Sequence, residues 1–179
     1  MKLKVNDEIF LELLELSHAH CLFDLVDSNR DHLRQWLPWL DMSKEVSDTE
    51  FFINSTIKQY KNNQGPQFLI DFKNTPCGVI GFHPIDLQNK IGGIGYWVSE
   101  SFSGNGIVTT SMALIIKYGF ETLSLNKIEV GCAVENQKSR AIPVKLGFKL
   151  EATLRDKEWL YDHYVDQCLY TMLKSEYNA

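Results

Sequence analysis

Three β-like runs follow one another in the middle of the chain, with only short connections between them. They span residues 67–72, 77–87 and 91–98, and the turn-forming stretches "KNTP" and "LQNK" separate them. Connections of this length favour β-hairpins, so we expect three antiparallel neighbours in one sheet. This order differs from the regular alternation of strand and helix in a doubly wound parallel sheet.

The elements on either side of these runs complete the predicted fold. Apolar spacing, capping residues and helix breakers predict four helices, at 17–29, from Asp48 to about 65, at 105–123 and at 137–146. The same patterns predict four further strands, at 9–16, 127–134, 150–159 and 164–173. We therefore expect an α/β fold of the α+β type, with a mixed, mostly antiparallel sheet of about seven strands and about four flanking helices. Residues 1–179 read as a single domain.

Composition and charge narrow the class of protein. With 179 residues, of which 44% are hydrophobic and 23% charged, the chain can bury one core. Its net charge of −5 argues against general nucleic-acid binding, which needs a basic surface. No apolar run is long enough to span a membrane, and the N-terminus lacks the apolar region of a signal peptide. We expect a cytoplasmic protein with neither a nucleic acid nor a membrane as its partner.

Cysteine and histidine residues form no recognisable metal or redox motif. The cysteines include no Cys-x-x-Cys pair, and we expect reduced, buried thiols at Cys21, Cys77, Cys132 and Cys168. The histidines show no metal-ligand spacing with acidic partners, and we interpret as structural or surface residues His18, His20, His32, His83 and His163. The sequence therefore predicts no metal site.

A glycine-rich stretch, Ser103-Gly104-Asn105-Gly106, opens the helix predicted at 105–123. The first N–H groups of a helix have no internal partner, and glycine lets a ligand approach them closely. Such a helix end binds anions, and phosphate is the usual one. Thr109 can add a hydroxyl donor one turn into the helix, so the stretch predicts a ligand that carries phosphate.

Three common motifs that would identify another ligand or chemistry are absent. The Gly-x-x-x-x-Gly-Lys-Ser/Thr string of a P-loop does not occur. Gly93-Ile94-Gly95 begins a dinucleotide fingerprint, but Val98 stands where its third glycine belongs. The Gly-x-Ser-x-Gly elbow of serine hydrolases is missing as well. These failures disfavour a nucleotide-binding regulator.

Two longer segments in order carry a family resemblance. "GYWVSESFSGNGIVTTSM", which ends at Met112, and "VENQKSRAIPVKLGF", which begins at Val134, together resemble the GCN5-related N-acetyltransferase family. The chain is most similar to its RimJ/RimL-like branch, which acetylates the N-termini of ribosomal proteins, and shares the early "WLPW" and the late "LRDKEWL". The resemblance covers essentially the whole chain. It implies the fold of that family, acetyl-CoA as cosubstrate and a homodimer.

The resemblance also implies where acetyl-CoA binds. The strand at 91–98 would separate from the strand at 127–134, so that pantetheine could pair with the strand backbone. The family often has Gln or Arg at Ser101 or Ser103, so pyrophosphate binding should depend here on backbone amides. The expected cofactor-binding residues are Tyr96, Trp97, Val98, Ser103, Gly104, Asn105, Gly106, Ile107, Thr109, Asn136 and Ser139.

Two catalytic residues follow from the same resemblance. Glu158 matches the glutamate that removes the amine proton, and its alternative is a solvated carboxylate at a strand end. Ser139 matches the serine that stabilises the departing thiolate, and its alternative is a local backbone bond at a helix N-terminus. Many members of the wider superfamily carry a catalytic tyrosine seven residues after Asn136, where this chain has Pro143.

The acceptor is less determined than the donor. An α-amine has a pKa of about 7.7–8.0, whereas a lysine amine, near 10.4, needs roughly 4 kcal/mol more help to lose its proton. We expect the N-terminal amine of a protein, for example ribosomal protein L7/L12, although a polyamine, an antibiotic amine or a non-catalytic acyl-CoA-binding module is the alternative. Trp36 and Trp39 resemble the substrate-side loop of the branch, or they are core anchors.

Overall fold

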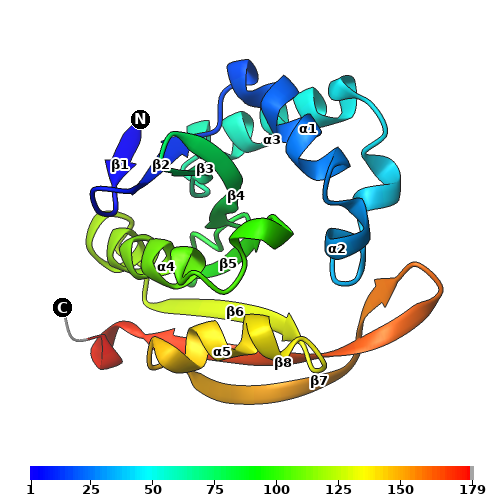
Figure 1. Ribbon diagram of the computed structural model, residues 1–179. Coiled ribbons are helices and arrows are strands. Elements are labelled where there is room, and N and C mark those ends of the chain that lie inside the picture. Colours follow the sequence, from blue (N-terminus) through cyan, green and yellow to red (C-terminus); the bar gives the residue numbers. More distant parts are fainter. Residues whose placement is uncertain (178–179) are drawn as a thin grey trace.

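Eight strands form one sheet in the computed structural model, which describes residues 1–177 (Figure 1). The strand order is β1-β2-β3-β4-β5-β6-β8-β7, and every neighbouring pair is antiparallel except β5 and β6, which are parallel. The strands are β1 (Lys2–Lys4), β2 (Ile9–Leu13), β3 (Gln67–Phe72), β4 (Thr75–Phe82), β5 (Ile91–Val98), β6 (Lys127–Ala133), β7 (Lys149–Leu160) and β8 (His163–Leu173). The predicted mixed, mostly antiparallel sheet is confirmed.

The strand predictions differ from the structure in three places. β1 was missed because a three-residue strand carries no detectable periodicity. The strand predicted at 9–16 ends at Leu13, and residues 16–18 form a 3₁₀ turn instead. The strand predicted at 77–87 is β4, which stops at Phe82 two residues before Pro84, a residue without the N–H that a sheet needs.

Five α-helices accompany the sheet in the described residues. They are α1 (Ala19–Asp27), α2 (Arg30–Arg34), α3 (Val46–Lys61), α4 (Ile107–Lys117) and α5 (Gln137–Lys145). The helix predicted at 17–29 is therefore α1, with α2 as a short continuation. The helix predicted at 105–123 is α4 followed by a π-helical turn at Tyr118–Thr122.

The start of α3 corrects one sequence prediction. Glu45, and not Asp48, is the N-cap residue, and Asp48 occupies the third position of the helix. There its carboxylate accepts hydrogen bonds from the backbone N–H groups of Lys44, at 2.8 Å, and Glu45, at 3.1 Å. Together with Glu45, Asp48 forms a capping box, so the helix begins before Asp48.

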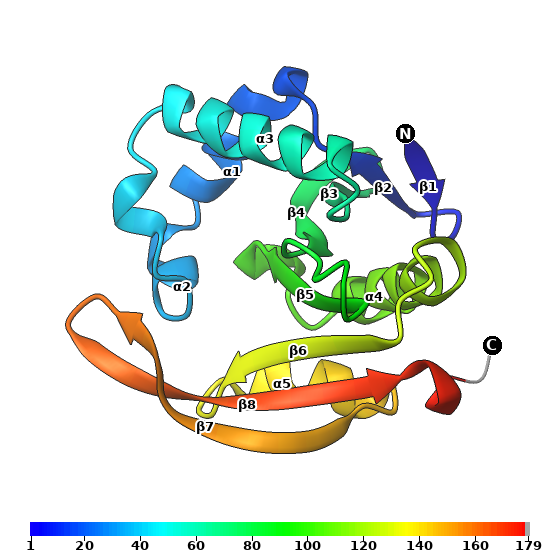
Figure 2. The ribbon, with the colours of Figure 1, turned by 180° about the vertical axis from the view of Figure 1, so that it is seen from behind.

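Helices cover both faces of the sheet, as the two opposite views show (Figures 1 and 2). α4 and α5 lie on one face, hereafter the α4/α5 face, where Met112 packs with Phe68 and Ile80. α1 and α3 lie on the other, hereafter the α1/α3 face, where Leu22 and Ile53 pack with Leu69 and Val79. Neighbouring residues of a strand thus reach different cores, as the alternation of a strand requires.

The parallel pair at the centre of the sheet is short. β5 and β6 pair at only three positions, from Ile91–Lys127 to Gly93–Glu129. β5 continues for five residues beyond Gly93, to Val98, while β4 still pairs with it. The two strands therefore separate from Gly93 onward, which leaves a gap in the sheet hereafter called the splay.

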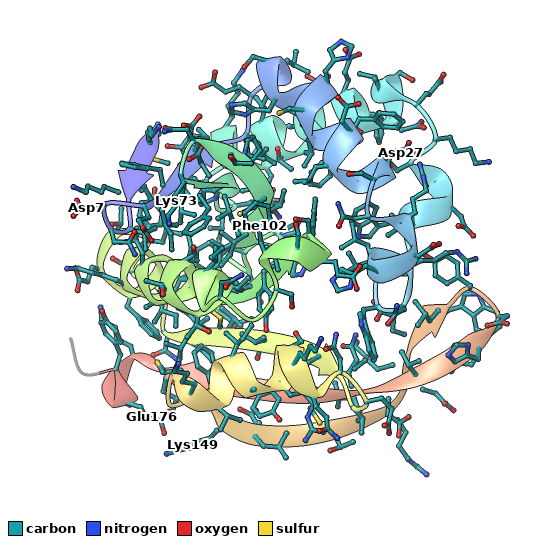
Figure 3. The ribbon with its side chains drawn as sticks, viewed as in Figure 1. Asp7, Asp27, Lys73, Phe102, Lys149 and Glu176 are labelled. Carbon is teal, nitrogen blue, oxygen red and sulfur yellow. The ribbon has the colours of Figure 1, made fainter. Side chains whose placement is uncertain are left out.

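Contacts fix both ends of the β7–β8 hairpin. At its tip, the Tyr161 hydroxyl donates to the Leu37 carbonyl, and the Arg34 guanidinium lies 3.7 Å from the centre of the Tyr161 ring. At the other end, Lys149 forms an ion pair with Glu176 beside the last described residues (Figure 3). No helix of residues 1–177 is long and apolar enough to cross a membrane.

Candidate active site

A large cleft of about 1420 Å³ occupies the region of the splay. This volume exceeds the roughly 300–1,000 Å³ typical of a site for one small ligand. Residues from both faces of the sheet line it, including Tyr96 and Ser139 on one side and His83 and Glu158 on the other. The cleft therefore has room for two substrates.

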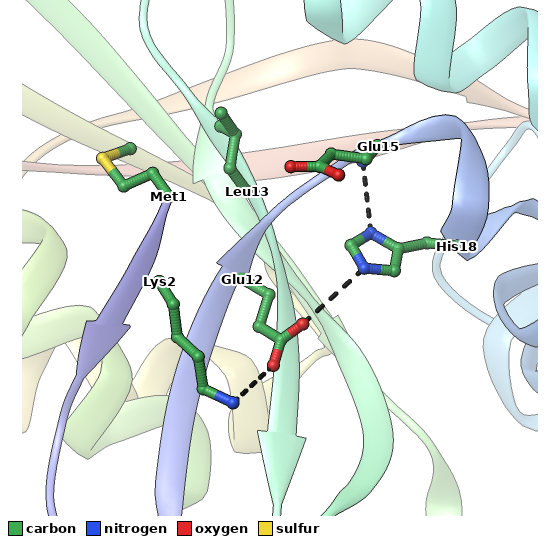
Figure 4. Close-up of a pocket in the computed structure, with 6 residues that line it drawn as sticks. All are labelled: Met1, Lys2, Glu12, Leu13, Glu15 and His18. Carbon is green, nitrogen blue, oxygen red and sulfur yellow. Dashed lines mark hydrogen bonds and ion pairs between the residues drawn. The ribbon is translucent and has the colours of Figure 1, made fainter.

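A second, much smaller hollow of about 190 Å³ lies at the edge of the sheet (Figure 4). Its polar side chains pair with one another: Lys2 Nζ lies 2.6 Å from Glu12, and His18 Nδ1 accepts a 3.1 Å hydrogen bond from the Glu15 N–H. Because these groups partner each other across β1, β2 and the 3₁₀ turn, the hollow is part of the fold's edge, and the large cleft is the candidate site.

Backbone groups line the walls of the splay. The Gly93 carbonyl of β5 accepts from the N–H of His83, which follows β4, and the N–H of Ser99, which follows β5, donates to the Cys77 carbonyl of β4. Alternation along the strand therefore turns the N–H and C=O groups of Ile94, Tyr96 and Val98 toward the splay. These groups can pair with an extended ligand that carries amides, as the resemblance to the acetyltransferase family implies for pantetheine.

Side chains on the two edges of the splay divide between the faces of the sheet. Tyr96 and Val98 pack with the core of the α4/α5 face. Gly93, Gly95 and Trp97 alternate with them and belong to the α1/α3 face, where Trp97 packs. A ligand in the splay is thus open to different side chains from each face.

The loop before α4 has the backbone geometry expected of an anion site. Gly104 and Gly106 have left-handed φ angles of +82° and +74°, and Gly106 is the N-cap of α4. No other protein atom lies within 4 Å of where a Cβ would stand at either glycine. Phe102, labelled in Figure 3, anchors the loop. Its ring packs edge-on against Phe72, with ring centres 5.9 Å apart.

Most of the predicted loop residues line the cleft, but one does not. Ser103, Gly104, Gly106, Ile107 and Thr109 line it, together with two residues that the sequence analysis missed, Phe102 and Val108. The Asn105 side chain is exposed and donates instead to the Phe102 carbonyl at 3.2 Å. Asn105 therefore shapes the loop, and its side chain does not line the cleft.

Ser139 lies in a hydrogen-bonded cluster on the α4/α5 side of the splay. Its Oγ donates to the Tyr96 hydroxyl at 3.1 Å and lies 3.3 Å from Cys132 Sγ. Asn136 caps α5 as predicted, since its Oδ1 accepts from the Ser139 N–H at 3.1 Å. Burial raises the pKa of both Tyr96 and Cys132, so both are neutral, and the cluster offers a hydroxyl and not a charge to a nearby sulfur.

Pro143 explains why Tyr96 belongs to this cluster. A proline lacks the N–H that would bond the carbonyl four residues earlier, which here is that of Ser139. The Tyr96 hydroxyl donates to that carbonyl at 3.0 Å. The chain thus lacks the superfamily's tyrosine at position 143 and holds a different tyrosine hydroxyl beside Ser139.

Glu158 lies on the other side of the splay, at the far end of β7. Its carboxylate accepts a 3.0 Å hydrogen bond from Gln167 Nε2, which fixes it toward the cleft, and the side chain is half-buried. The sequence analysis missed Gln167 and His83, both of which line the cleft. Neither has a local sequence signal, because β4, β7 and β8 bring them together only in the folded sheet.

Aromatic side chains form the wall above the α1/α3 face. Trp36 and Trp39 are half-buried and line the cleft, so neither is a fully buried core anchor, and their contact with an acceptor stays a prediction. The Trp39 ring packs against Trp97 with ring centres 6.3 Å apart. Phe51 and Phe52 of α3 extend this wall, and Phe51 is 79% exposed. An acceptor on this face would meet apolar rings as well as the Glu158 carboxylate.

Comparison with known proteins identifies the family. Residues 8–149 match the acetyltransferase (GNAT) domain family. The chain belongs to this family. The YdaF protein of Bacillus subtilis (strain 168) is 35% identical over 178 residues, which cover 98% of this chain and 97% of that protein.

Two solved structures are similar over nearly the whole chain. RimL, the ribosomal L7/L12 α-N-protein acetyltransferase in complex with coenzyme A, has a TM-score of 0.92 and 29% identity, with 97% of this chain and 98% of that one covered. The microcin C7 self-immunity acetyltransferase MccE, in complex with acetyl-CoA and AMP, has a TM-score of 0.90 and 33% identity, with 96% and 95% covered. This GNAT chain therefore has the fold of acyl-CoA-dependent N-acetyltransferases.

Among residues 1–177, no group of three or more His, Cys, Asp or Glu side chains is placed to hold a metal ion. The anion site at α4 and the amides of the splay fit a ligand with a phosphate end and an amide-bearing arm.

Proposed function

We propose that this protein transfers the acetyl group of acetyl-CoA to the N-terminal amine of a protein, with ribosomal protein L7/L12 as the first candidate. The observation that carries the proposal is the division of the cleft by the sheet. Ser139 lies on the α4/α5 face and Glu158 on the α1/α3 face, with the splay between them. Donor and acceptor can therefore reach one carbon atom from opposite sides.

Acetyl-CoA would enter from the α4/α5 face. Its pyrophosphate would bind the free N–H groups at the start of α4, beside Gly104 and Gly106. Its pantetheine arm would pair with the β5 backbone in the splay. The N–H of Val98, which points into the splay, is placed to polarise the thioester carbonyl.

The acceptor amine would enter from the α1/α3 face. An ammonium group first loses a proton to Glu158, directly or through water, and its nitrogen lone pair then attacks the thioester carbon. The C–N bond forms, the C–S bond breaks, and its electron pair leaves with the sulfur. The nitrogen loses its second proton, and the thiolate, stabilised by the Ser139 hydroxyl, ends as the free thiol of CoA.

Two observations favour a protein N-terminus over a small amine. RimL, a similar structure, is an L7/L12 α-N-acetyltransferase. The acceptor side is also broad, with the exposed Phe51 and Met42 along its rim, which suits an extended chain. MccE is in complex with AMP as well as acetyl-CoA, so a small-molecule amine is the alternative. A homodimer in the cytoplasm remains part of the proposal.

The test is mass spectrometry of an amine panel incubated with the protein and acetyl-CoA. The panel holds peptides that start with Ser, Ala or Met, a lysine peptide blocked at its N-terminus, and spermidine. We expect the peptide with N-terminal Ser to gain one acetyl group and the blocked peptide to remain unchanged. Acetylation of spermidine in preference to every peptide would contradict the proposal.

A further inference from the structure

The glycines of β5 leave room for a side chain from the neighbouring strand. The imidazole of His83, the residue after β4, lies along β5 on the α1/α3 face. A Cβ at Gly95 would stand 2.7 Å from His83 Nε2, and a Cβ at Gly93 would stand 3.5 Å from His83 Cδ2. The His83 N–H donates to the Gly93 carbonyl at 2.8 Å, which fixes the base of the side chain. Gly93-Ile94-Gly95, which does not complete a dinucleotide-binding motif, therefore makes room for the His83 ring.

The opposite edge of the splay is built in the same way. The register Gly93–Glu129 places Gly95 across the splay from Gly131 of β6. A Cβ at Gly131 would stand 3.0 Å from Gln167 Oε1, so the Gln167 side chain covers this second glycine. Gln167 in turn donates to Glu158. Gly95 and Gly131 thus face each other across the splay. His83 lies over Gly95, and the hydrogen-bonded pair of Gln167 and Glu158 lies beside Gly131.

The surroundings of His83 keep its imidazole neutral. The ring is open to the solvent of the cleft, but protein atoms surround that cleft, and this poor hydration lowers the pKa of His83 while Glu158 raises it. Of the other acidic residues that line the cleft, Glu129 lies 3.1 Å from Lys127 and Asp48 accepts backbone hydrogen bonds in the capping box of α3, while Glu100 is exposed in the loop before α4. A neutral imidazole can accept a hydrogen bond from an N–H group.

We propose that His83 binds the acceptor amine directly, with its imidazole on the β5 side of the splay and Glu158 on the β7 side. Glu158 takes a proton from the ammonium, and His83 accepts a hydrogen bond from an N–H that remains, which directs the nitrogen lone pair toward the thioester. The inference rests on the proposed entry of the acceptor from the α1/α3 face. It does not depend on which amine is the natural acceptor.

The first experiment compares steady-state kinetics of His83→Ala and His83→Gln with those of the unchanged protein. The acceptor in these assays is the panel amine that the unchanged protein acetylates. Which amine this is tests the proposed function, whereas the effect of the variants tests the role of His83. We expect His83→Ala to lower kcat/KM for the acceptor about fivefold to tenfold, the effect of losing one neutral hydrogen bond. The Kd for acetyl-CoA should change less than twofold.

His83→Gln should recover part of the loss, because its amide oxygen can accept the same hydrogen bond. It should also remove the acid limb that protonated His83 contributes to the pH profile of kcat/KM. The matched control is His20→Gln, since His20 is an exposed residue of α1 that does not line the cleft. If His83→Ala keeps kcat/KM within twofold, or weakens acetyl-CoA binding to the same degree, the inference is wrong.

A second measurement needs no turnover. The imidazole signals of His83 can be followed by NMR while spermidine, as a cationic probe, is added to the protein saturated with CoA. We expect the His83 signals to shift and those of His20 to stay in place, and the shift should weaken in Glu158→Gln. Signals of His83 that do not respond to spermidine or to the peptide with N-terminal Ser would overturn the inference.

Discussion

Replacing Tyr96 with phenylalanine tests how the cluster around Ser139 is held. The change removes one hydroxyl and with it the hydrogen bonds from Tyr96 to the Ser139 carbonyl at 3.0 Å and from Ser139 Oγ to Tyr96 at 3.1 Å, as well as a 3.8 Å contact with Cys132 Sγ. The Ser139 carbonyl cannot turn to the usual helix partner, because residue 143 is a proline without an N–H. The variant therefore leaves a half-buried carbonyl without its partner.

The size of the effect follows from that unpaired group. An unsatisfied buried polar group costs about 1–3 kcal/mol of unfolding free energy. At about 2–4 °C per kcal/mol for a chain of this length, Tyr96→Phe should lower Tm by roughly 2–12 °C. Thermal unfolding followed by circular dichroism measures the change. Tyr164→Phe, at an exposed tyrosine, is the matched control and should cost less than about 0.5 kcal/mol.

A double-mutant cycle with Pro143→Ala makes the test specific. Alanine at position 143 supplies the missing N–H, so the Ser139 carbonyl has a partner even without Tyr96. We expect Tyr96→Phe to cost about 1 kcal/mol less in the Pro143→Ala background than in the unchanged protein. An equal cost in both backgrounds would refute the reasoning that the tyrosine replaces the bond that the proline removes.

Three further predictions concern the site. Glu158→Gln should lower kcat about 10²–10⁴-fold and leave the Kd for acetyl-CoA within twofold, as kinetics and calorimetry would show; a loss under tenfold would exclude Glu158 as the base. Gly106→Ala should cost about 1–2 kcal/mol of stability from its left-handed φ and weaken CoA binding, because the new Cβ points into open space at the anion site; unchanged binding would remove this loop from the phosphate site. The pKa of His83, measured by NMR, should lie below about 6.5 and fall further in Glu158→Gln, and a pKa above about 6.5 would contradict this. The neutral ring should stabilise the fold above about pH 6.5, and this contribution to the free energy of unfolding should decline as the pH falls toward the folded-state pKa.

The sequence predicts the order of the elements because local patterns determine it. Hairpin connections, the glycine loop and the Asn136 cap each act within a few residues, and all are present in the fold. The boundaries of α3 were misjudged because two acidic residues, Glu45 and Asp48, share one capping box. Local chemistry thus identifies an element more securely than its first residue.

The acceptor side of the site could not be predicted from local patterns. His83 follows β4, Glu158 lies on β7 and Gln167 lies on β8, and only the folded sheet brings them to one cleft. The glycines that make room for them, Gly95 and Gly131, look like ordinary strand residues until the neighbouring strands are in place. The same holds for Tyr96, whose role beside Pro143 depends on how β5 lies against α5.

The structure of the protein with a bisubstrate analogue, in which the sulfur of CoA is joined through an acetyl group to the N-terminal nitrogen of a serine peptide, tests the central claim most directly. The account predicts that the pyrophosphate lies at the start of α4, the acetyl group lies in the splay beside Val98, and the peptide leaves along the α1/α3 face between His83 and Glu158. A peptide that leaves along the α4/α5 face, or an acetyl group outside the splay, would contradict the division of the site between the two faces of the sheet.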